Sequence, residues 1–287
     1  RILKMKKILA LMLALCMVFA LAACGEPASE PSDAPVSDAP EASEAPASEA
    51  PETETPADAE GGLTIVVGKL TMSTNAQFPP YEMTTDDGGF EGIDVEIATA
   101  IAEKLGLELD ILDMDFDSAL LAVQQGKSDI VMAGVTVNDD RLLVMDFSTS
   151  YANGVQVVIV KEGSDTTSDN RGEGLIGTQR GPTGNIYCTD DYGEEHVVAY
   201  DDGFTAVQAL VNGQVDCVVI DNAPAQEFVK NNAGLAILDT EYANEDYAIG
   251  VNKGNSALLD AINGALEELI ADGTVQSIID KYIPAAE

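Results

Sequence analysis

Hydrophobic residues from position 63 onward fall into two kinds of run, one with helical spacing and one continuous. Ile93, Ile97, Ile101 and Leu105 recur every four residues and predict one apolar face of a helix that ends at Gly106. Short apolar runs between polar or glycine residues predict buried strands. The predicted strands are 63–67, 109–112, 129–133, 156–160, 175–178, 197–200, 215–220 and 235–238. The further predicted helices are 118–125, 185–192, 204–211, 223–231, 256–271 and 274–282.

This alternation of strands and helices favours an α/β fold with largely parallel sheets and right-handed crossovers. Within it, SALLAVQQGKSDIVMAG (118–134) and TAVQALVNGQVDCVVID (205–221) run in register, 87 residues apart. Each unit reads as a helix, a glycine turn, an aspartate and a buried strand. Because ligands of such sheets bind beyond the carboxyl ends of strands, we expect Gly134 and Asp221 on opposing walls of one cleft. The alternative is that helix–glycine–strand units recur by chance in an α/β protein.

The first 24 residues are typical of a processing signal rather than of a folded element. Basic residues precede an apolar stretch at 8–21, and Leu-Ala-Ala-Cys follows at 21–24. The stretch is short for a membrane span and has the small-residue end of a secretory signal. Cys24 is therefore a candidate lipidation site, and Met5 is the expected start. The alternative for Cys24 is an ordinary cleaved signal with a chance cysteine.

Residues 25–62 are expected to form a disordered acidic linker. They consist mainly of Pro, Ser, Ala and acidic residues and contain almost nothing apolar. Such a segment cannot bury enough surface to order itself, and its like charges extend it.

Composition excludes some classes of function. The chain carries 14 Lys and Arg against 50 Asp and Glu, a net charge of −36, which argues against a nucleic-acid partner. The single histidine, His196, leaves no cluster of imidazole ligands, and no Gly-x-Ser-x-Gly elbow is present. Cys188 and Cys217 lack the spacing of a zinc site. We expect free thiols there, although an extracytoplasmic location would permit a disulfide. No metal, no cofactor and no catalytic residue are expected.

Arg141 is the first candidate for binding, because it is a scarce cation placed just after a predicted strand. Its planar guanidinium matches a carboxylate with two parallel hydrogen bonds, and the Thr136 hydroxyl is nearby in the chain. The alternative is a surface ion pair with Asp139 or Asp140. Asp221, at the end of a predicted buried strand, could accept a hydrogen bond from a substrate ammonium. The alternative for Asp221 is the N-cap of the following helix.

The turn GTQRGPTG (177–184), which contains Gln179, could present backbone N–H groups to an anion at a helix N-terminus. It lacks the lysine and spacing of a phosphate-binding loop, so a carboxylate held with Thr183 is favoured. Phe78, Tyr81 and Phe116 could stack on a substrate side chain, although aromatic residues are more often part of a core. The Pro-Pro pair after Phe78 forces a loop and argues against simple core burial.

Residues 63–287 resemble a family 3 extracellular solute-binding protein, the amino-acid-binding lipoprotein of an ABC importer. The matching stretches are NAQFPPYE, FEGIDVEIATAIAEKLG, MDFDSALLAVQQGKSDIVMAGVTVNDDR, MDFSTSY, GTQRGPTG, AVQALVNGQVDCVVIDNAPA and ALEELIADGTVQSIIDKY. The resemblance implies a two-lobe, type II periplasmic-binding-protein-like fold, with a mostly parallel sheet in each lobe. It implies that 63–152 plus 249–287 form lobe 1 and 153–248 form lobe 2, joined by two hinge strands near 151–154 and 247–250.

The resemblance also implies roles for individual residues. Arg141, helped by Thr136 and Thr183, would hold the α-carboxylate of an amino acid. Gly134 and Asp221 would contact its α-ammonium. The expected side-chain contacts are Asn75, Phe78, Phe116 and Gln179. Asn75 is neutral where relatives that take basic amino acids often carry an acid, and Pro182 replaces the usual first threonine of the turn.

We therefore expect a monomeric receptor, anchored by lipid on the extracytoplasmic face of the membrane, that delivers an amino acid to an ABC permease. Asn75 and Ile220 favour a ligand with a neutral polar or apolar side chain. Two alternatives stay open at this point. One is an enzyme on the same scaffold, such as a dehydratase or a lyase, and the other is a ligand-sensing module for a separate membrane receptor.

Overall fold

The computed structural model describes residues 62–239 and 241–283, which all lie in one compact unit. The predicted signal (1–24), the lipidation site Cys24 and the linker (25–62, apart from Gly62) lie outside the described residues. No described helix has the length and apolar content needed to cross a membrane.

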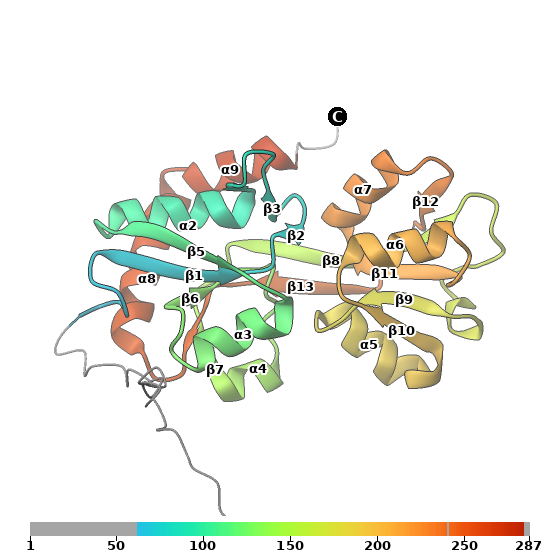
Figure 1. The fold of residues 1–287 in the computed structure, drawn as a ribbon, viewed down its shortest axis with the longest axis horizontal. Coiled ribbons are helices and arrows are strands. Elements are labelled where there is room, and N and C mark those ends of the chain that lie inside the picture. Colours follow the sequence, from blue (N-terminus) through green and yellow to red (C-terminus); the bar gives the residue numbers. More distant parts are fainter. Residues whose placement is uncertain (1–61, 240, 284–287) are drawn as a thin grey trace, which may run out of the picture. The chain divides into compact units, whose positions relative to one another are not determined.

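Lobe 1, as we use the name, is built on a five-stranded sheet with the strand order β5-β1-β6-β14-β7 (Figure 1). Its strands are β1 (Lys69–Thr74), β5 (Glu108–Asp113), β6 (Ile130–Val131), β7 (Met145–Phe147) and β14 (Gly250–Asn252). Its helices are α2 (Ile93–Lys104), α3 (Phe116–Gln124), α4 (Asp139–Val144), α8 (Ser256–Ala271) and α9 (Thr274–Tyr282). A small sheet of β2 (Gln77–Phe78), β3 (Glu82–Thr84) and β4 (Phe90–Glu91) precedes α2.

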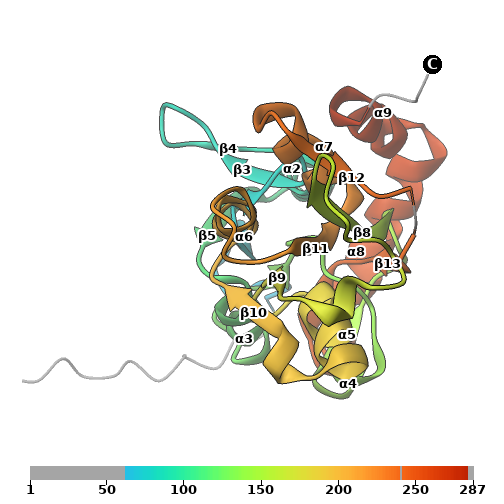
Figure 2. The same ribbon diagram turned by 90° about the vertical axis from the view of Figure 1, so that its right-hand side faces the viewer.

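Lobe 2 is built on a six-stranded sheet, with α6 and α7 on one side and α5 on the other (Figures 1 and 2). Its strands are β8 (Ala152–Lys161), β9 (Ile176–Gln179), β10 (Val197–Tyr200), β11 (Cys217–Asp221), β12 (Leu235–Ile237) and β13 (Ala243–Tyr247). Its helices are α5 (Thr183–Tyr192), α6 (Gly203–Val211), α7 (Asn222–Asn231) and the short 3-10 turns η1 (Arg171–Glu173) and η2 (Glu194–His196).

Both sheets are mixed, whereas the sequence predicted mostly parallel ones. The edges β5-β1-β6 and β10-β9-β11 are parallel. The pairs made by β14 and β8 are antiparallel. These strands reverse direction because they lie where the chain passes between the lobes. β8 and β13 pair with each other from Ala152–Tyr247 to Gln156–Ala243 and run between the two groups of elements (Figure 1).

One predicted strand, 63–67, is wrong. These residues form bends, with Ile65 47% and Val67 92% exposed, and the strand β1 follows at Lys69–Thr74 with Leu70 and Met72 fully buried. The β-branched run 64–67 has strand propensity but no core to pack against, and burial decides the outcome. The other predicted strands and helices are present, with shifted ends. The sequence did not predict α4, β7, β13, β14 or the small sheet.

Both thiols of the described region are free and buried, as expected for Cys188 and Cys217. They lie in the same apolar cluster of lobe 2, against the sheet residues Val158, Ile176 and Val219. Burial raises the pKa of each thiol to about 12, so both are poor nucleophiles.

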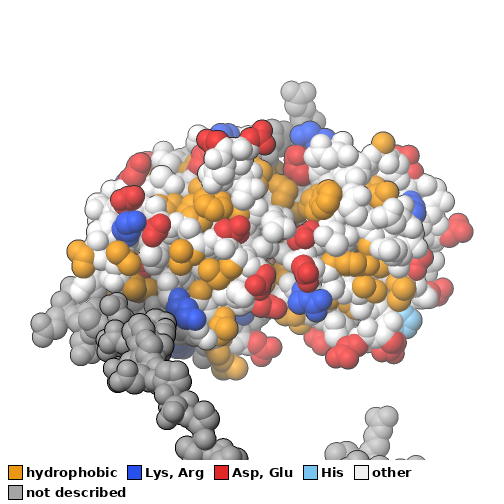
Figure 3. Space-filling view, viewed as in Figure 1, with side chains coloured by type: hydrophobic (Ala, Val, Ile, Leu, Met, Phe, Trp, Pro, Cys, Tyr) orange, Lys and Arg blue, Asp and Glu red, His pale blue; other side chains and the backbone are white. Residues whose placement is uncertain are grey.

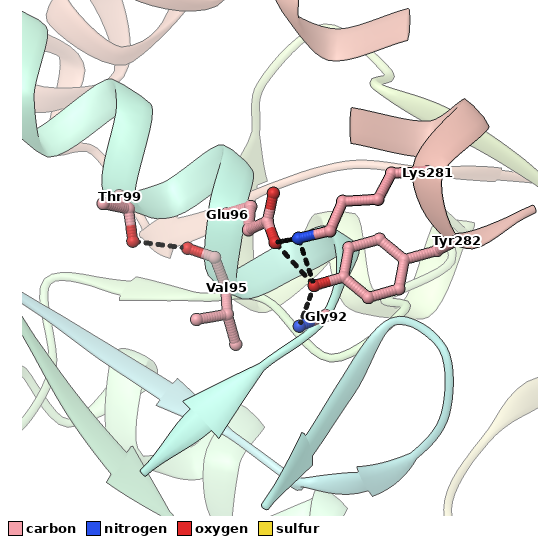
Figure 4. Close-up of polar contacts among 6 residues, drawn as sticks. All are labelled: Gly92, Val95, Glu96, Thr99, Lys281 and Tyr282. Carbon is pink, nitrogen blue, oxygen red and sulfur yellow. Dashed lines mark hydrogen bonds and ion pairs between the residues drawn. The ribbon is translucent and has the colours of Figure 1, made fainter. Parts of the chain in front are cut away.

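The end of the described chain is tied to the start of α2 (Figure 4). The Tyr282 hydroxyl donates to the Glu96 carboxylate at 2.5 Å and accepts from the backbone N–H of Gly92 at 3.2 Å. Lys281 forms an ion pair with the same carboxylate. These contacts fix the first turn of α2, which carries the buried residue Asp94.

Candidate functional site

The nine residues predicted to bind a ligand all line one cavity between the lobes. Lobe 1 contributes Asn75, Phe78, Phe116, Gly134, Thr136 and Arg141, and lobe 2 contributes Gln179, Thr183 and Asp221. The walls lie close together, since the free volume is about 10 Å³, room for roughly one water molecule. The structure thus brings the predicted residues together, and their contacts with a ligand remain a prediction.

Arg141 is a buried cation without a buried counter-ion in contact with it. Its side chain is on α4, whose N-cap Asn138 accepts a hydrogen bond from the Arg141 backbone N–H. The residue is only 7% exposed, and its guanidinium donates to the carbonyl oxygens of Thr136 at 2.9 Å and Gly181 at 3.4 Å. Among the described residues, no carboxylate forms an ion pair with it, so the surface pair with Asp139 or Asp140 is not observed.

Burial shapes the electrostatics of this cation. It lowers the pKa of Arg141 below the ordinary value, and the more distant charge of Glu245 partly offsets that effect. The guanidinium also lies over the Phe116 ring, 5.2 Å from its centroid. Figure 3 shows acidic side chains scattered over this face, with fewer basic ones among them. The cavity therefore offers an anion a positive group that the acidic surface does not.

The N-terminus of α5 adds backbone donors to the same half of the cavity. Thr183 and Gly184, at the start of this helix, both line the cavity, and no side chain caps it. The first N–H groups of a helix have no intrahelical partner and attract anions. Pro182 has no N–H, so Thr183 supplies the first one. Its hydroxyl also lies 3.3 Å from the Thr136 hydroxyl across the cleft.

Asp221 lies at the end of β11 on the lobe 2 wall and is 1% exposed. One carboxylate oxygen accepts from the backbone N–H of Ala223 at 3.0 Å, which makes Asp221 the N-cap of α7. The other accepts from Val155 on β8 at 2.8 Å. Burial raises the pKa of Asp221 to about 6, and these backbone donors partly offset the rise. A helix cap and a place in the cavity wall, the two alternatives for Asp221, are thus compatible. The side chain caps α7 and also lines the cavity.

Gly134 lies opposite on the lobe 1 wall, and its conformation requires glycine. Its φ is +54°, and a Cβ there would meet the Phe78 ring at 3.0 Å. Its backbone N–H donates to Asp94 on α2 at 2.9 Å. The carboxylate therefore fixes the orientation of the glycine peptide at the cavity wall.

Aromatic rings form the walls of the remaining part of the cavity. Phe78 is 6% exposed and stacks on Tyr81 with a centroid distance of 5.8 Å, and Tyr81 meets Tyr247 edge to face. Phe78 belongs to the main core cluster as well as to the cavity lining. The expectation that the Pro-Pro pair would keep Phe78 out of the core is therefore wrong.

A direct hydrogen bond joins the lobes near these rings. Gln179 on β9 donates from its side-chain amide to the Asn75 amide oxygen at 2.9 Å, and Asn75 donates to the Met114 carbonyl at 3.0 Å. This hydrogen bond therefore spans the two walls of the cavity.

Glu82, Gln156 and Tyr247 are among the cavity residues that the sequence did not indicate. Glu82 is the last residue of the NAQFPPYE stretch, two positions after Pro80, and this stretch was the available signal. Gln156 and Tyr247 lie on β8 and β13, the strands that pass between the lobes. Within residues 62–239 and 241–283, no group of three or more His, Cys, Asp or Glu is placed to hold a metal ion.

Comparison with known proteins matches residues 70–285 to the family described as bacterial extracellular solute-binding proteins, family 3. The L-cystine-binding protein TcyJ of Escherichia coli (strain K12) is 31% identical over 222 residues, covering 76% of this chain and 84% of that protein. The L-arginine-binding protein of Pseudomonas aeruginosa is 32% identical over 227 residues, with coverages of 74% and 87%. A solved structure of an ancestral arginine-binding protein bound to glutamine is 38% identical, with a TM-score of 0.72 over 76% of this chain and 99% of that one.

Proposed function

This chain belongs to the bacterial extracellular solute-binding proteins of family 3, and on that premise we propose that it is a receptor for a free amino acid. The ligand binds between the lobes and is delivered to an ABC permease. The relatives named for cystine and arginine support this class of ligand.

The observation that carries the proposal is the buried guanidinium of Arg141, which has no carboxylate partner, in the same cavity as the buried carboxylate of Asp221. A buried charge without a partner costs several kcal/mol, so each group favours a ligand of opposite charge. A zwitterion supplies both charges at once. Its carboxylate pairs with Arg141 and the N–H groups of α5, and its ammonium pairs with Asp221.

The side chain of the ligand is proposed to be neutral, polar or apolar. Asn75 and Gln179 present amides to that part of the cavity, and Phe78 and Phe116 present aromatic faces. The related ancestral protein bound to glutamine supports a neutral ligand in this fold.

Ligand binding is proposed to couple the lobes. Residues 63–152 plus 249–287 would move against residues 153–248, about the paired strands β8 and β13. A ligand that touches both walls favours the closed arrangement, because it loses half of its contacts when the lobes separate.

The location and assembly are also proposals. Lipidation at Cys24 would hold a monomer on the extracytoplasmic face of the membrane, and Cys24→Ser would release it from the membrane fraction. The chain is proposed to bind its ligand without turnover, so incubation with the bound amino acid should leave that amino acid chemically unchanged.

The test is calorimetric titration of the purified protein with amino acids chosen by a thermal-shift screen. We expect a Kd of micromolar or tighter, about −8 kcal/mol or beyond. Arg141→Ala should weaken binding by at least about 100-fold, because removal of one partner of a buried ion pair costs about 3–5 kcal/mol.

Arg180→Ala is the matched control. Arg180 lies in the same glycine-rich turn, but its side chain is 57% exposed and pairs with Asp201 at 3.7 Å. This variant should bind normally. Near-normal affinity in Arg141→Ala, with an intact fold by circular dichroism, would overturn the assignment.

A further inference from the structure

Glu82 is a carboxyl group in the cavity wall that nothing in the predicted site uses. It is fully buried on β3 and lines the cavity. Neither of its oxygens accepts a hydrogen bond from an N–H or O–H group of the described residues. An unpartnered buried polar group is costly, and in a binding cavity it indicates a contact that the ligand completes.

Asp94 lies beside Glu82 and is equally buried. The backbone N–H of Asp94 donates to the Tyr81 carbonyl at 2.9 Å, which places the first turn of α2 against the start of β3. One Asp94 oxygen accepts from Gly134, and the other receives no N–H or O–H from the described chain. The two carboxyls act on each other electrostatically, and one oxygen of Asp94 and both oxygens of Glu82 have no hydrogen-bond partner in the described chain.

The groups packed around this pair are acids and phenols. Asp113 on β5 acts on Glu82, the Tyr151 hydroxyl lies against Asp94, and Tyr81 lies between the pair and Asp221. With no cation beside them, two adjacent buried carboxyls do not both ionise at neutral pH, because repulsion adds to the cost of burial. They then titrate as a unit that holds one proton over a wide pH range.

The direction of each pKa shift agrees with that geometry. Burial raises the pKa of Glu82 well above its usual range, and the nearby carboxylate of Asp94 adds to the rise. Burial raises the pKa of Asp94 to about 6, an effect that the Gly134 N–H partly offsets. Between that value and the higher pKa of Glu82, the proton resides on Glu82.

We propose that Glu82 and Asp94 share one proton and thereby set the side-chain charge that the cleft accepts. With the proton in place, the free oxygen of Glu82 accepts a hydrogen bond from a neutral N–H or O–H group of the ligand. A cationic side chain binds well only when Glu82 is ionised, and one proton then passes from its carboxyl group to the solvent for each ligand bound.

This inference rests on the proposed amino-acid receptor function and makes its specificity depend on pH. Affinity for a neutral amino acid should be flat above about pH 7, where Asp221 and Asp94 are already ionised and no proton is exchanged. Affinity for a basic amino acid should rise by up to about tenfold per pH unit, because each binding event releases one proton.

The experiment is calorimetric titration of the full protein with glutamine and arginine at pH 7.5, 8.0 and 8.5, where Asp221 is already ionised. Both side chains present N–H donors, and only arginine is cationic. Repetition in buffers with different ionisation enthalpies counts the protons released. We expect about one proton for arginine and none for glutamine, with arginine affinity increasing at each step.

Glu82→Gln separates this role from a merely structural one, because the amide mimics the protonated acid and can still donate to Asp94. Glutamine should bind within about threefold of the wild-type affinity, since only one acceptor is exchanged for another. The proton release and the pH dependence with arginine should disappear. Glu91→Gln, an exposed position on the adjacent strand β4, is the matched control and should behave as the wild type.

A second readout is stability against pH. The pKa of Glu82 in the folded state is above its unfolded value, so its contribution to stability is largest at low pH and falls as pH rises. Glutamine at this position does not titrate. The melting temperature of Glu82→Gln relative to the wild type should therefore increase from pH 5 to pH 8.5.

The outcomes are distinguishable. Proton release with glutamine, arginine binding that is absent or independent of pH, or a Glu82→Gln variant with an unchanged arginine profile overturns the inference. So does failure of both ligands while another amino acid binds. If no amino acid binds the protein or shifts its melting temperature at any pH, the receptor function itself fails.

Discussion

The α3–β6 unit of lobe 1 and the α6–β11 unit of lobe 2 are built alike, yet they end in different chemistry. Asp115 caps α3 with a hydrogen bond from the backbone N–H of Ser118 at 3.0 Å. Asp202, 87 residues later, caps α6 in the same way through Thr205 at 2.6 Å. Both helices end at a glycine with positive φ, +66° at one and +72° at the other. The repeat therefore fixes the direction of each strand that follows.

The aspartates at the entry to the strands also match. The backbone N–H of Asp129 donates to the Thr71 carbonyl on the neighbouring strand at 2.9 Å, and that of Asp216 donates to the Leu175 carbonyl at 2.8 Å. Their carboxylates accept backbone N–H groups from the same two residues. In both lobes the aspartate holds two parallel strands in register.

The units differ at their last residue. Lobe 1 ends in Gly134, which brings a peptide close to the cavity and leaves the acid, Asp94, behind it. Lobe 2 ends in Asp221, which brings its carboxylate directly to the wall. The repeated unit therefore places the end of a strand at the cavity wall in both lobes. The last residue of the unit, Gly134 or Asp221, decides whether that wall presents a peptide group or a negative charge.

The largest expected effect is on stability. It tests whether the equivalent residues Asp129 and Asp216 contribute equally to the free energy of unfolding. Asp129 is 4% exposed and also accepts from Ile65 and the Thr71 hydroxyl, whereas Asp216 is exposed. Asp129→Ala should lower the free energy of unfolding by about 3–5 kcal/mol, because several buried donors lose their acceptor. Asp216→Ala should cost about 1 kcal/mol. Urea unfolding measures the free energy of unfolding of both variants. Equal losses of stability would contradict the prediction that Asp129 contributes more than Asp216.

The next effect concerns the strand end of lobe 2. Asp221→Asn removes the charge but keeps a side chain that can cap α7, since Asn is as good an N-cap as Asp. Amino-acid affinity should fall by about 2–3 kcal/mol, or roughly 30- to 150-fold. The melting temperature should also fall, because the single amide oxygen cannot accept from both Ala223 and Val155. Asp202→Asn, at the exposed cap of α6, is the control. Equal affinity in both variants would remove Asp221 from the site.

The strand end of lobe 1 gives a smaller effect. Gly134→Ala should cost about 1–2 kcal/mol of stability, because alanine is strained at this φ and its Cβ meets the Phe78 ring. Its amino-acid affinity should also fall. Gly126→Ala carries similar backbone strain, but nothing lies within 4 Å of its Cβ. The Gly126 variant should therefore keep its amino-acid affinity. If calorimetry showed the same loss of affinity in both variants, backbone strain rather than the contact with Phe78 would explain it.

The smallest effect is a pH dependence that belongs to lobe 2. The pKa of Asp221 is about 6, and only the ionised carboxylate pairs with an ammonium group. As pH falls below 6, the affinity for a neutral amino acid should drop about tenfold per unit, or 1.4 kcal/mol. Titrations between pH 4.5 and 7 check this. A flat profile would show that Asp221 does not pair with the ligand.

Much of this site could be predicted from the sequence, because its charges are rare or periodic. Arg141 stands out in an acidic chain, and Asp221 was found from the register of the repeat. The questions that the sequence left open concern the positions of side chains in space. The sequence could not decide between a cap and a cavity role for Asp221, and the structure shows that one carboxylate meets both positions.

The missed parts share a physical cause. In β13 (ANEDY), Glu245 and Tyr247 are buried and Asp246 is exposed. Because one of the buried residues is an acid, the sequence shows no alternation of apolar and polar residues. Strands β7 and β14 are three residues long, too short for a periodic pattern. Conversely, the run 63–67 has the composition of a strand but lies at the surface. Composition predicts which segments could form strands, and only tertiary packing decides which do.

The position of β14 has a consequence for the order in which the chain can be completed. This strand lies between β6 and β7 in lobe 1, although it follows the whole of lobe 2 in the sequence. During synthesis, all strands of the second sheet emerge before the one that joins β6 to β7. The lobe that is started first is therefore completed last, because its sheet needs Gly250–Asn252, which are made after all strands of lobe 2.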